Sequence, residues 1–189
     1  MNSDSTIAQQ APQIDQTNSR LTIRLDDDGA PAKASQNLLA GFSFGKCPHK
    51  NPAIIDLGLE PIGKEFQLEN WWYDGDVTVK KLGDITTAVC SDYTVITVQK
   101  SEAVDAKFSE FAYQAFKELL RTVQTTQNTR LVKIWAYFNA INDGEDDLER
   151  YRQFSVGRAK AFAELDMDKQ PMPTGTAVGT FNSNSFTLV

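Results

Sequence analysis

Residues 131–162 have the sequence LVKIWAYFNAINDGEDDLERYRQFSVGRAKAF, in which an apolar run ends at an acidic turn and is followed by a second patterned segment. Apolar side chains alternate along residues 131–138, which predicts a strand with one face in the core and a mixed second face. The acidic side chains at 145–147 suit the positive end of a helix dipole, and they predict a helix from about Asp146 to Leu165. This strand, turn and helix decide the second half of the fold.

The segments around this unit predict the remaining elements. Apolar side chains recur at steps of three and four in residues 108–123, which is typical of a helix with one apolar stripe laid on a sheet. Strands are predicted at residues 21–25, 38–45, 65–73, 76–82, 85–99, 174–180 and 185–189, with 85–99 folding as a hairpin that turns near Ser91-Asp92. The predicted fold class is α+β, a mixed β-sheet packed on one face by two α-helices.

Length and composition predict one globular domain over residues 20–189, since 41% of the 189 residues are hydrophobic. Residues 1–19 are rich in Gln, Ser, Asn and Asp, and they predict a disordered tail because they cannot offset the entropy of ordering. Apolar runs are too short to cross a bilayer, and the start lacks the basic and apolar regions of a signal peptide. We therefore expect a cytoplasmic protein without a membrane partner.

Charge and side-chain inventory argue against several function classes. The formal net charge is -6, which disfavours nucleic acid as a partner because such binding needs clustered basic residues. Two cysteines and the single histidine His49 are too few for a disulfide scaffold or a zinc site. The expectation is a protein without a metal site and without nucleic-acid binding.

Two arginines of the second predicted helix fall among apolar side chains. At 100° per residue, Arg152 and Arg158 share an arc with Tyr151 and Phe162, whereas Arg150 falls with the polar set. A guanidinium keeps its charge, so partial burial implies a facing anion. That anion is either the carboxylate of a small-molecule ligand or an acid of this chain, and structural pairs of the second kind are commoner.

Blocks within this half of the sequence resemble the chorismatase family. They are Trp135, Ile141-Asn142, Arg150-Tyr151-Arg152, Gly157-Arg158-Ala159 and Thr176-Ala177-Val178-Gly179. The likeness covers roughly residues 36–189 and is strongest in the last third. It implies a Rid/YjgF-like fold and the cleavage of chorismate to pyruvate and a hydroxybenzoate or dihydrodiol, without metal or organic cofactor. Such chemistry belongs to aromatic biosynthesis and secondary metabolism.

The resemblance also implies a substrate-binding set. Arg152 and Arg158 would clamp carboxylates, Tyr151 and Trp135 would form pocket walls, and Asn142 lies in the matching turn. No catalytic residue is assigned, because family enzymes are nearly twice as long and take their glutamate acid from a second, similar domain.

Two features depart from the family pattern: Ala136 follows Trp135 where an Asn is usual, and Ser155 stands where a Cys is common. Three interpretations of function are therefore open. The chain acts within a homo-oligomer, such as a Rid-type trimer, or with a partner chain that supplies the missing half. Alternatively, it is a non-catalytic ligand-binding or partner subunit. A weaker alternative is a Rid-type imine or enamine deaminase, disfavoured because Gly175 occupies the position where those enzymes carry an Arg after Pro173.

Overall fold

The computed structural model describes residues 19–26, 30–31, 33–46, 48–63, 65–102, 107–126, 129–181 and 184–189. The tail predicted for residues 1–19 therefore lies outside the described residues, apart from its last position.

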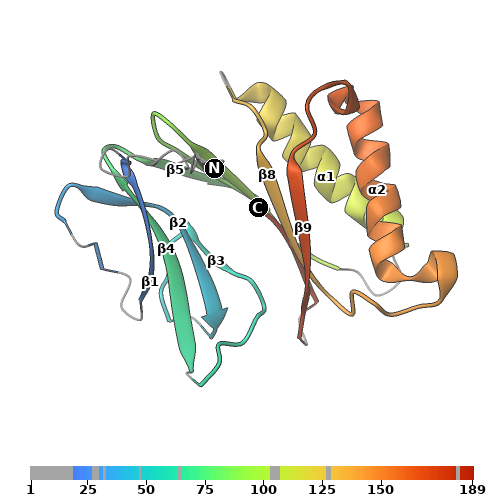
Figure 1. Ribbon diagram of the computed structural model, residues 1–189, viewed down its shortest axis with the longest axis horizontal. Coiled ribbons are helices and arrows are strands. Elements are labelled where there is room, and N and C mark those ends of the chain that lie inside the picture. Colours follow the sequence, from blue (N-terminus) through green and yellow to red (C-terminus); the bar gives the residue numbers. More distant parts are fainter. Residues whose placement is uncertain are drawn as a thin grey trace, which may run out of the picture.

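The described residues form two β-sheets and two α-helices (Figure 1). A four-stranded sheet has the order β1 (Leu21–Asp26), β4 (Phe66–Asp74), β2 (Gln36–Gly45) and β3 (Ile54–Asp56). A six-stranded sheet has the order β5 (Thr78–Leu82), β6 (Ile85–Val89), β7 (Thr94–Ser101), β10 (Ser185–Leu188), β8 (Lys133–Asn139) and β9 (Thr174–Thr180). Both sheets are mixed, because β2 pairs with β3, and β8 with β9, in parallel.

Helices α1 (Phe108–Thr125) and α2 (Arg150–Glu164) cover one face of the six-stranded sheet. Its opposite face packs against the four-stranded sheet, and Figure 1 shows this order of layers. The predicted fold class is thus confirmed, but the strands of the first half do not all join one sheet. Both sheets have an apolar face to bury, and stacking them buries both faces.

Strand β8 shows why the layers stack in this order. Its alternation sends Ile134, Ala136 and Phe138 under the helices, while Trp135 and Tyr137 point toward the four-stranded sheet. The mixed second face expected from the sequence is therefore also an interior face.

The core under the helices is built from aromatic rings. Phe138 is 0% exposed, and its ring centroid lies 5.3 Å from that of Phe108, 5.0 Å from Phe154 and 5.8 Å from Phe186. These rings come from α1, α2, β8 and β10, so the cluster joins elements that are distant in sequence. Offset aromatic contacts of this length add to the stabilisation from burial alone.

A glycine determines how closely the two helices approach. A Cβ on Gly157 would lie 2.4 Å from the carbonyl oxygen of Ser109 and 2.7 Å from the amide nitrogen of Tyr113. Only a residue without a side chain permits this backbone contact between α1 and α2. The buried face of α2 therefore runs through Phe154, Gly157 and Ala161, whereas the apolar side chain of Val156 is exposed.

A polar cluster joins the two sheets at the turn between β6 and β7. The hydroxyl of Tyr73 on β4 donates to Asp92 Oδ2 at 2.6 Å and lies 2.7 Å from Ser91 Oγ. The guanidinium of Arg20 stacks over the Tyr73 ring at 4.7 Å. Hydrogen bonds from Tyr73, and then from Ser91, lower the pKa of Asp92.

Replacing Phe138 with Ala is expected to lower the free energy of unfolding by about 3–5 kcal/mol, because it leaves a cavity among four packed elements. Urea denaturation measures the change. The control is Leu82→Ala, at a side chain that is 83% exposed, with an expected change within about 0.5 kcal/mol. Equal losses in the two variants would contradict the central place of Phe138.

Replacing Tyr73 with Phe is expected to lower the melting temperature at neutral pH and to return the pKa of Asp92 toward its ordinary value of 3.8. A lowered carboxyl pKa stabilises the fold above the ordinary value, and the contribution is lost as pH falls through the lowered one. The difference between wild type and Tyr73→Phe should therefore shrink below pH 3.8. Thermal melts across pH, with the exposed Tyr93→Phe as control, measure it. A difference that is constant with pH would exclude a role for Asp92.

Candidate functional site

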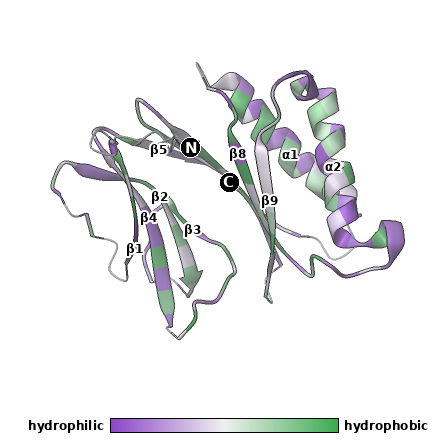
Figure 2. Ribbon diagram, in the orientation of Figure 1, coloured by the Kyte–Doolittle hydropathy of each residue, from purple (hydrophilic) through white to green (hydrophobic). Residues whose placement is uncertain are grey.

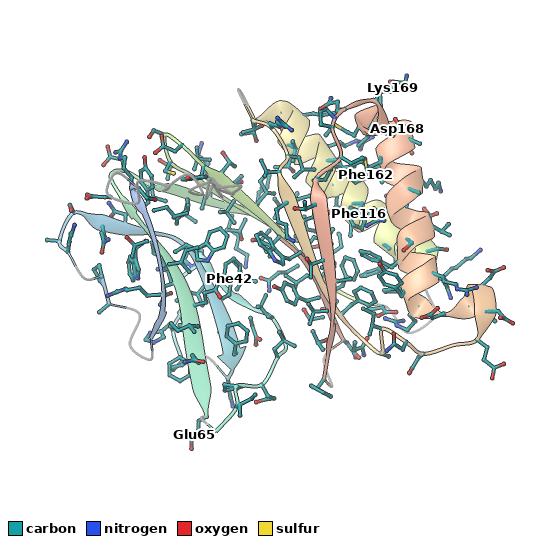
Figure 3. The ribbon with its side chains drawn as sticks, viewed as in Figure 1. Phe42, Glu65, Phe116, Phe162, Asp168 and Lys169 are labelled. Atoms are coloured by element: carbon teal, nitrogen blue, oxygen red, sulfur yellow. The ribbon has the colours of Figure 1, made fainter. Side chains whose placement is uncertain are left out.

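A cleft lies between α2 and the strands β8 and β9, at the end of the six-stranded sheet. Its cavity volume is about 50 Å³, and it opens to solvent. Figure 3 labels Phe116 on α1 and Phe162 on α2, which form its inner wall. The remaining lining residues are Ile134, Ala136, Tyr151, Phe154, Arg158, Met172, Pro173, Gly175, Thr176 and Ala177.

Arg158 carries the positive charge of this cleft. Its guanidinium carbon lies 5.9 Å from the ring centroid of Phe154, and Nη1 lies 3.4 Å from the point where a Cβ on Gly175 would sit. A Cβ at this position would be in ordinary van der Waals contact with the guanidinium, so Arg158 lies close over Gly175. Among the residues that the structure describes, no carboxylate lies within 4.0 Å of Arg158. A half-buried guanidinium beside apolar walls and without an acidic partner can bind an anion from solvent.

The described lining of the cleft offers a positive charge but no acidic side chain. Tyr151 and Arg158 are its titratable side chains, and Thr176 adds a hydroxyl group. The described lining contains no carboxylic acid, histidine or cysteine. The cleft therefore offers a cation to a carboxylate and apolar surface beside it, but its described lining has no carboxyl group to protonate a substrate.

The five residues predicted from the sequence do not converge on one place. Arg158 and Tyr151 both line the cleft, where the Tyr151 ring stacks on Phe154 at 6.0 Å. Arg152 points away from it, with its side chain 54% exposed, and lies 3.5 Å from Asp147 and 3.3 Å from Glu149. Arg152 therefore has acidic partners in its own chain.

The other two predicted residues lie elsewhere. Asn142 is exposed in the turn that precedes α2. Trp135 points to the opposite face of the sheet, where its ring centroid lies 5.9 Å from that of Trp71 and its face is 5.2 Å from Lys133 Nζ. There it lines a groove between the start of β7 and the start of β8, together with Trp71 of the four-stranded sheet and Leu119 of α1. Alternation along the strand makes it impossible for Trp135 and Ala136 to line the same hollow.

Arg150, which the sequence assigned to the polar face, is the arginine that the structure buries most fully in α2. Its side chain is 18% exposed and binds Glu102 through two hydrogen bonds of 2.8 and 2.7 Å. The guanidinium also stacks on Phe108 at 3.8 Å, and Nε donates to the carbonyl oxygen of Asn139 at 3.2 Å. Arg150 thus ties the start of α2 to the ends of β7 and β8.

The position of the buried face explains this correction, because at 100° per residue Arg150 falls between Gly157 and Phe154, which α2 buries. The sequence predicted one helix from about Asp146, but the chain forms a 3-10 turn at Asp146–Leu148 and then an extended residue, Glu149, with ψ of 129°. Helix α2 therefore begins only at Arg150, four residues after the predicted start, and runs unbroken to Glu164. Arg150 and Asn139 lie at the two ends of the segment that joins β8 to α2, and they are in contact. Helical periodicity carries no information about a contact of this kind.

Within the described ranges, no group of three or more His, Cys, Asp and Glu side chains could hold a metal ion. The search for membrane spans over the same ranges found no helix with the length and apolar character to cross a bilayer.

Comparisons with known proteins agree on one family. A family model described as "Chorismatase FkbO/Hyg5-like, N-terminal" matches residues 69–189. A curated chorismatase of Streptomyces hygroscopicus is 44% identical over 50 residues, which cover 26% of this chain and 14% of the relative. A crystal structure of a chorismatase matches with a TM-score of 0.73 and 21% identity, covering 89% of this chain and 52% of the other. The chain thus spans about half of that solved protein, and at this identity the likeness shows the fold alone.

Replacing Arg150 with Met is expected to lower the free energy of unfolding by about 3 kcal/mol, because Glu102 would remain largely buried without its cation. Chemical denaturation measures the loss. Arg152→Met is the matched control on the same helix, and its exposed pairs should change stability by less than about 1 kcal/mol. A larger loss in the control than in Arg150→Met would contradict this assignment.

Proposed function

Because the chain belongs to the FkbO/Hyg5-like chorismatase family, we propose that it binds chorismate or a related cyclic carboxylate in the cleft beside Arg158. One observation carries the proposal: within the described chain, the Arg158 guanidinium faces a cleft with apolar walls and forms no ion pair. A ligand carboxylate would supply the negative charge that Arg158 does not find within the described chain.

Each part of the ligand has a matching group in the cleft. The guanidinium offers two parallel N–H donors, which suit one planar carboxylate. Phe154 and Met172 offer apolar surface to the carbon atoms of a ring, and the Tyr151 and Thr176 hydroxyls can bond to its polar substituents. The cleft accepts the carboxylate end of such a ligand, while the rest lies at its open side beside the exposed Tyr151.

Binding and cleavage make different demands. Cleaving chorismate to pyruvate and a hydroxybenzoate or dihydrodiol requires a proton donor at the enol ether, and the described lining has no carboxylic acid. In our proposal the chain supplies the anion site, and a neighbouring copy or a partner chain supplies the acid. A non-catalytic ligand-binding subunit is the alternative, and the acid-free lining favours it whenever the chain acts alone.

The Rid-type deaminase alternative has one supporting observation. Arg158 Nη1 occupies the space above Gly175, the position that carries an arginine in those enzymes. Arg158 on α2 therefore places its positive charge where those enzymes place the charge of an arginine on the strand. Ammonia release from an imino acid tests this alternative directly.

Arg158→Gln is expected to abolish the rise in melting temperature that chorismate produces in the wild type, with affinity falling about 10-fold to 100-fold on loss of the charged pair. Thermal shift across a chorismate titration measures it. Arg158→Lys should retain part of the effect, because it keeps the charge but not the planar fork. The control is Arg121→Gln, an exposed arginine of α1.

The sequence-based expectation that Arg152 also clamps a carboxylate is tested in parallel. Arg152→Gln should leave the ligand-induced shift unchanged if Arg158 is the anion site alone, and should reduce it if both arginines act. An undiminished shift in Arg158→Gln would exclude the cleft as the binding site. Pyruvate release in the same samples separates an active assembly from a binding subunit.

A further inference from the structure

Strand β9 is the last strand of the six-stranded sheet, and its outer backbone groups have no partner strand. It pairs in parallel with β8, and the amide of Thr174 donates to the carbonyl oxygen of Val132 at 3.0 Å. Backbone groups of alternate residues point to opposite sides of a strand. The even-numbered residues therefore face β8, and the N–H and C=O groups of Gly175, Ala177 and Gly179 point outward.

A second contact confirms this alternation and marks where the free edge ends. The amide of Phe181, another odd-numbered residue, donates to the carbonyl oxygen of Gly58 at 3.3 Å. Within the described chain, no side chain or loop bonds to the outer groups of Gly175, Ala177 and Gly179. The free edge therefore extends from Gly175 to Gly179.

The two ends of the sheet differ in their protection. The opposite end strand, β5, carries Lys80 and Lys81, and charges of this kind discourage edge pairing. Residues 174–181 contain no charged side chain and no proline. Figure 2 shows β9 pale along its length, neither strongly hydrophilic nor strongly hydrophobic. An uncharged, unpaired edge is a template for another strand.

We propose that β9 pairs antiparallel with β9 of a second copy of this chain, around a two-fold axis at Ala177. The strand sequence TGTAVGT is nearly the same in both directions. Pairing centred on Ala177 sets Thr174 against Thr180, Gly175 against Gly179 and Thr176 against Val178. The outward groups of Ala177 would exchange both hydrogen bonds with their copy, which is the hydrogen-bonded pair of an antiparallel ladder. A two-fold interface requires such self-complementarity.

Apolar side chains that flank the strand support a second copy as the occupant. Met172 is 58% exposed just before β9, and Phe181 is 74% exposed just after it. Antiparallel pairing brings the start of one strand to the end of the other, so Met172 of each copy meets the region of Phe181 from its partner. The interface would cover two exposed apolar side chains per chain.

Charge supports the same direction of pairing. The end of the sheet where β9 starts has a small excess of basic side chains, since Arg130, Lys133 and Lys169 lie there with Asp166 and Asp168. An acidic turn follows Asn139, which pairs with Thr180 at the other end. The acidic residues of that turn are Asp143, Glu145, Asp146 and Asp147. Antiparallel pairing brings the basic end of one copy toward the acidic end of the other, whereas parallel pairing would bring like charges together.

The pairing has a consequence for the cleft. Gly175 lies under Arg158, and its partner in the two-fold ladder is Gly179 of the second copy. Ile141 lies over Gly179, 2.8 Å from where its Cβ would be, and the acidic turn follows Ile141. The second copy would therefore add a wall and carboxylates beside the Arg158 cleft. The pairing itself depends on the strand edge and not on the proposed ligand, and it gives a dimer where the sequence suggested a trimer.

Sedimentation velocity across a concentration series tests the pairing. The wild type is expected to move from one chain toward a species of twice 21.0 kDa as concentration rises. Ala177→Pro removes an outward N–H, which an edge strand tolerates, and is expected to raise the dimer dissociation constant at least tenfold. A wild type that remains monomeric at the highest concentration, or that forms a trimer, overturns the proposal.

A second pair of variants tests the pairing even if Ala177→Pro does not fold. Phe181→Glu changes an exposed side chain beside β9 and is expected to weaken the dimer at least tenfold with an unchanged melting temperature. Leu82→Glu, at a similarly exposed position on the opposite edge, should leave the dimer unchanged. Equal weakening by both variants, or a dimer unaffected by Phe181→Glu, shows that the copies meet elsewhere and overturns the proposal.

Discussion

Burial of both faces of β8 is the constraint on which the rest of the structure depends. Phe138 and Ile134 need the helices above them, and Trp135 and Tyr137 need the four-stranded sheet below. A strand that is apolar on both sides cannot lie at a solvated face, so the layers must stack as helix, sheet and sheet. The aromatic cluster around Phe138 then aligns α1 and α2, and the close approach at Gly157 determines the rotation of α2 about its own axis.

That rotation gives three neighbouring arginines three different roles. Arg150 turns into the interior and binds Glu102, Arg152 turns out to the acidic turn, and Arg158 lies over Gly175 without an acid from the described chain. Each guanidinium has the same charge and the same intrinsic chemistry. What differs is the surroundings: paired charges inside a fold serve its stability, and an unpaired charge at a cleft is available to a ligand.

The cleft and the free strand edge lie side by side, which links binding to assembly. Gly175 belongs to both, since it lies under Arg158 on one side and presents unpaired backbone groups outward. The lining supplies a cation and apolar walls but no carboxylic acid. In the proposed function this cleft binds the carboxylate of an anionic ring, and a neighbouring copy or a partner chain supplies the acid for proton transfer. This division fits a chain that spans about half of the solved chorismatase it resembles.

The sequence by itself determined the fold class and the order of most elements, because helix and strand periodicity, acidic turns and strand alternation are local properties. The strand at 174–180 has the bounds that the pattern predicts, and the first helix begins at the predicted Phe108 but extends to Thr125. Only the tertiary structure decided that the strands divide into two sheets, that Arg150 is buried, and that Trp135 lies across the sheet from Arg158. These outcomes depend on contacts between distant segments: the close approach at Gly157 turns Phe154 and Ala161 toward the core, and Arg150 lies on the same face of α2. Periodicity gives the angles of side chains around a helix but not which face packs or which acid lies opposite, so the partner of each arginine could not be predicted from spacing alone.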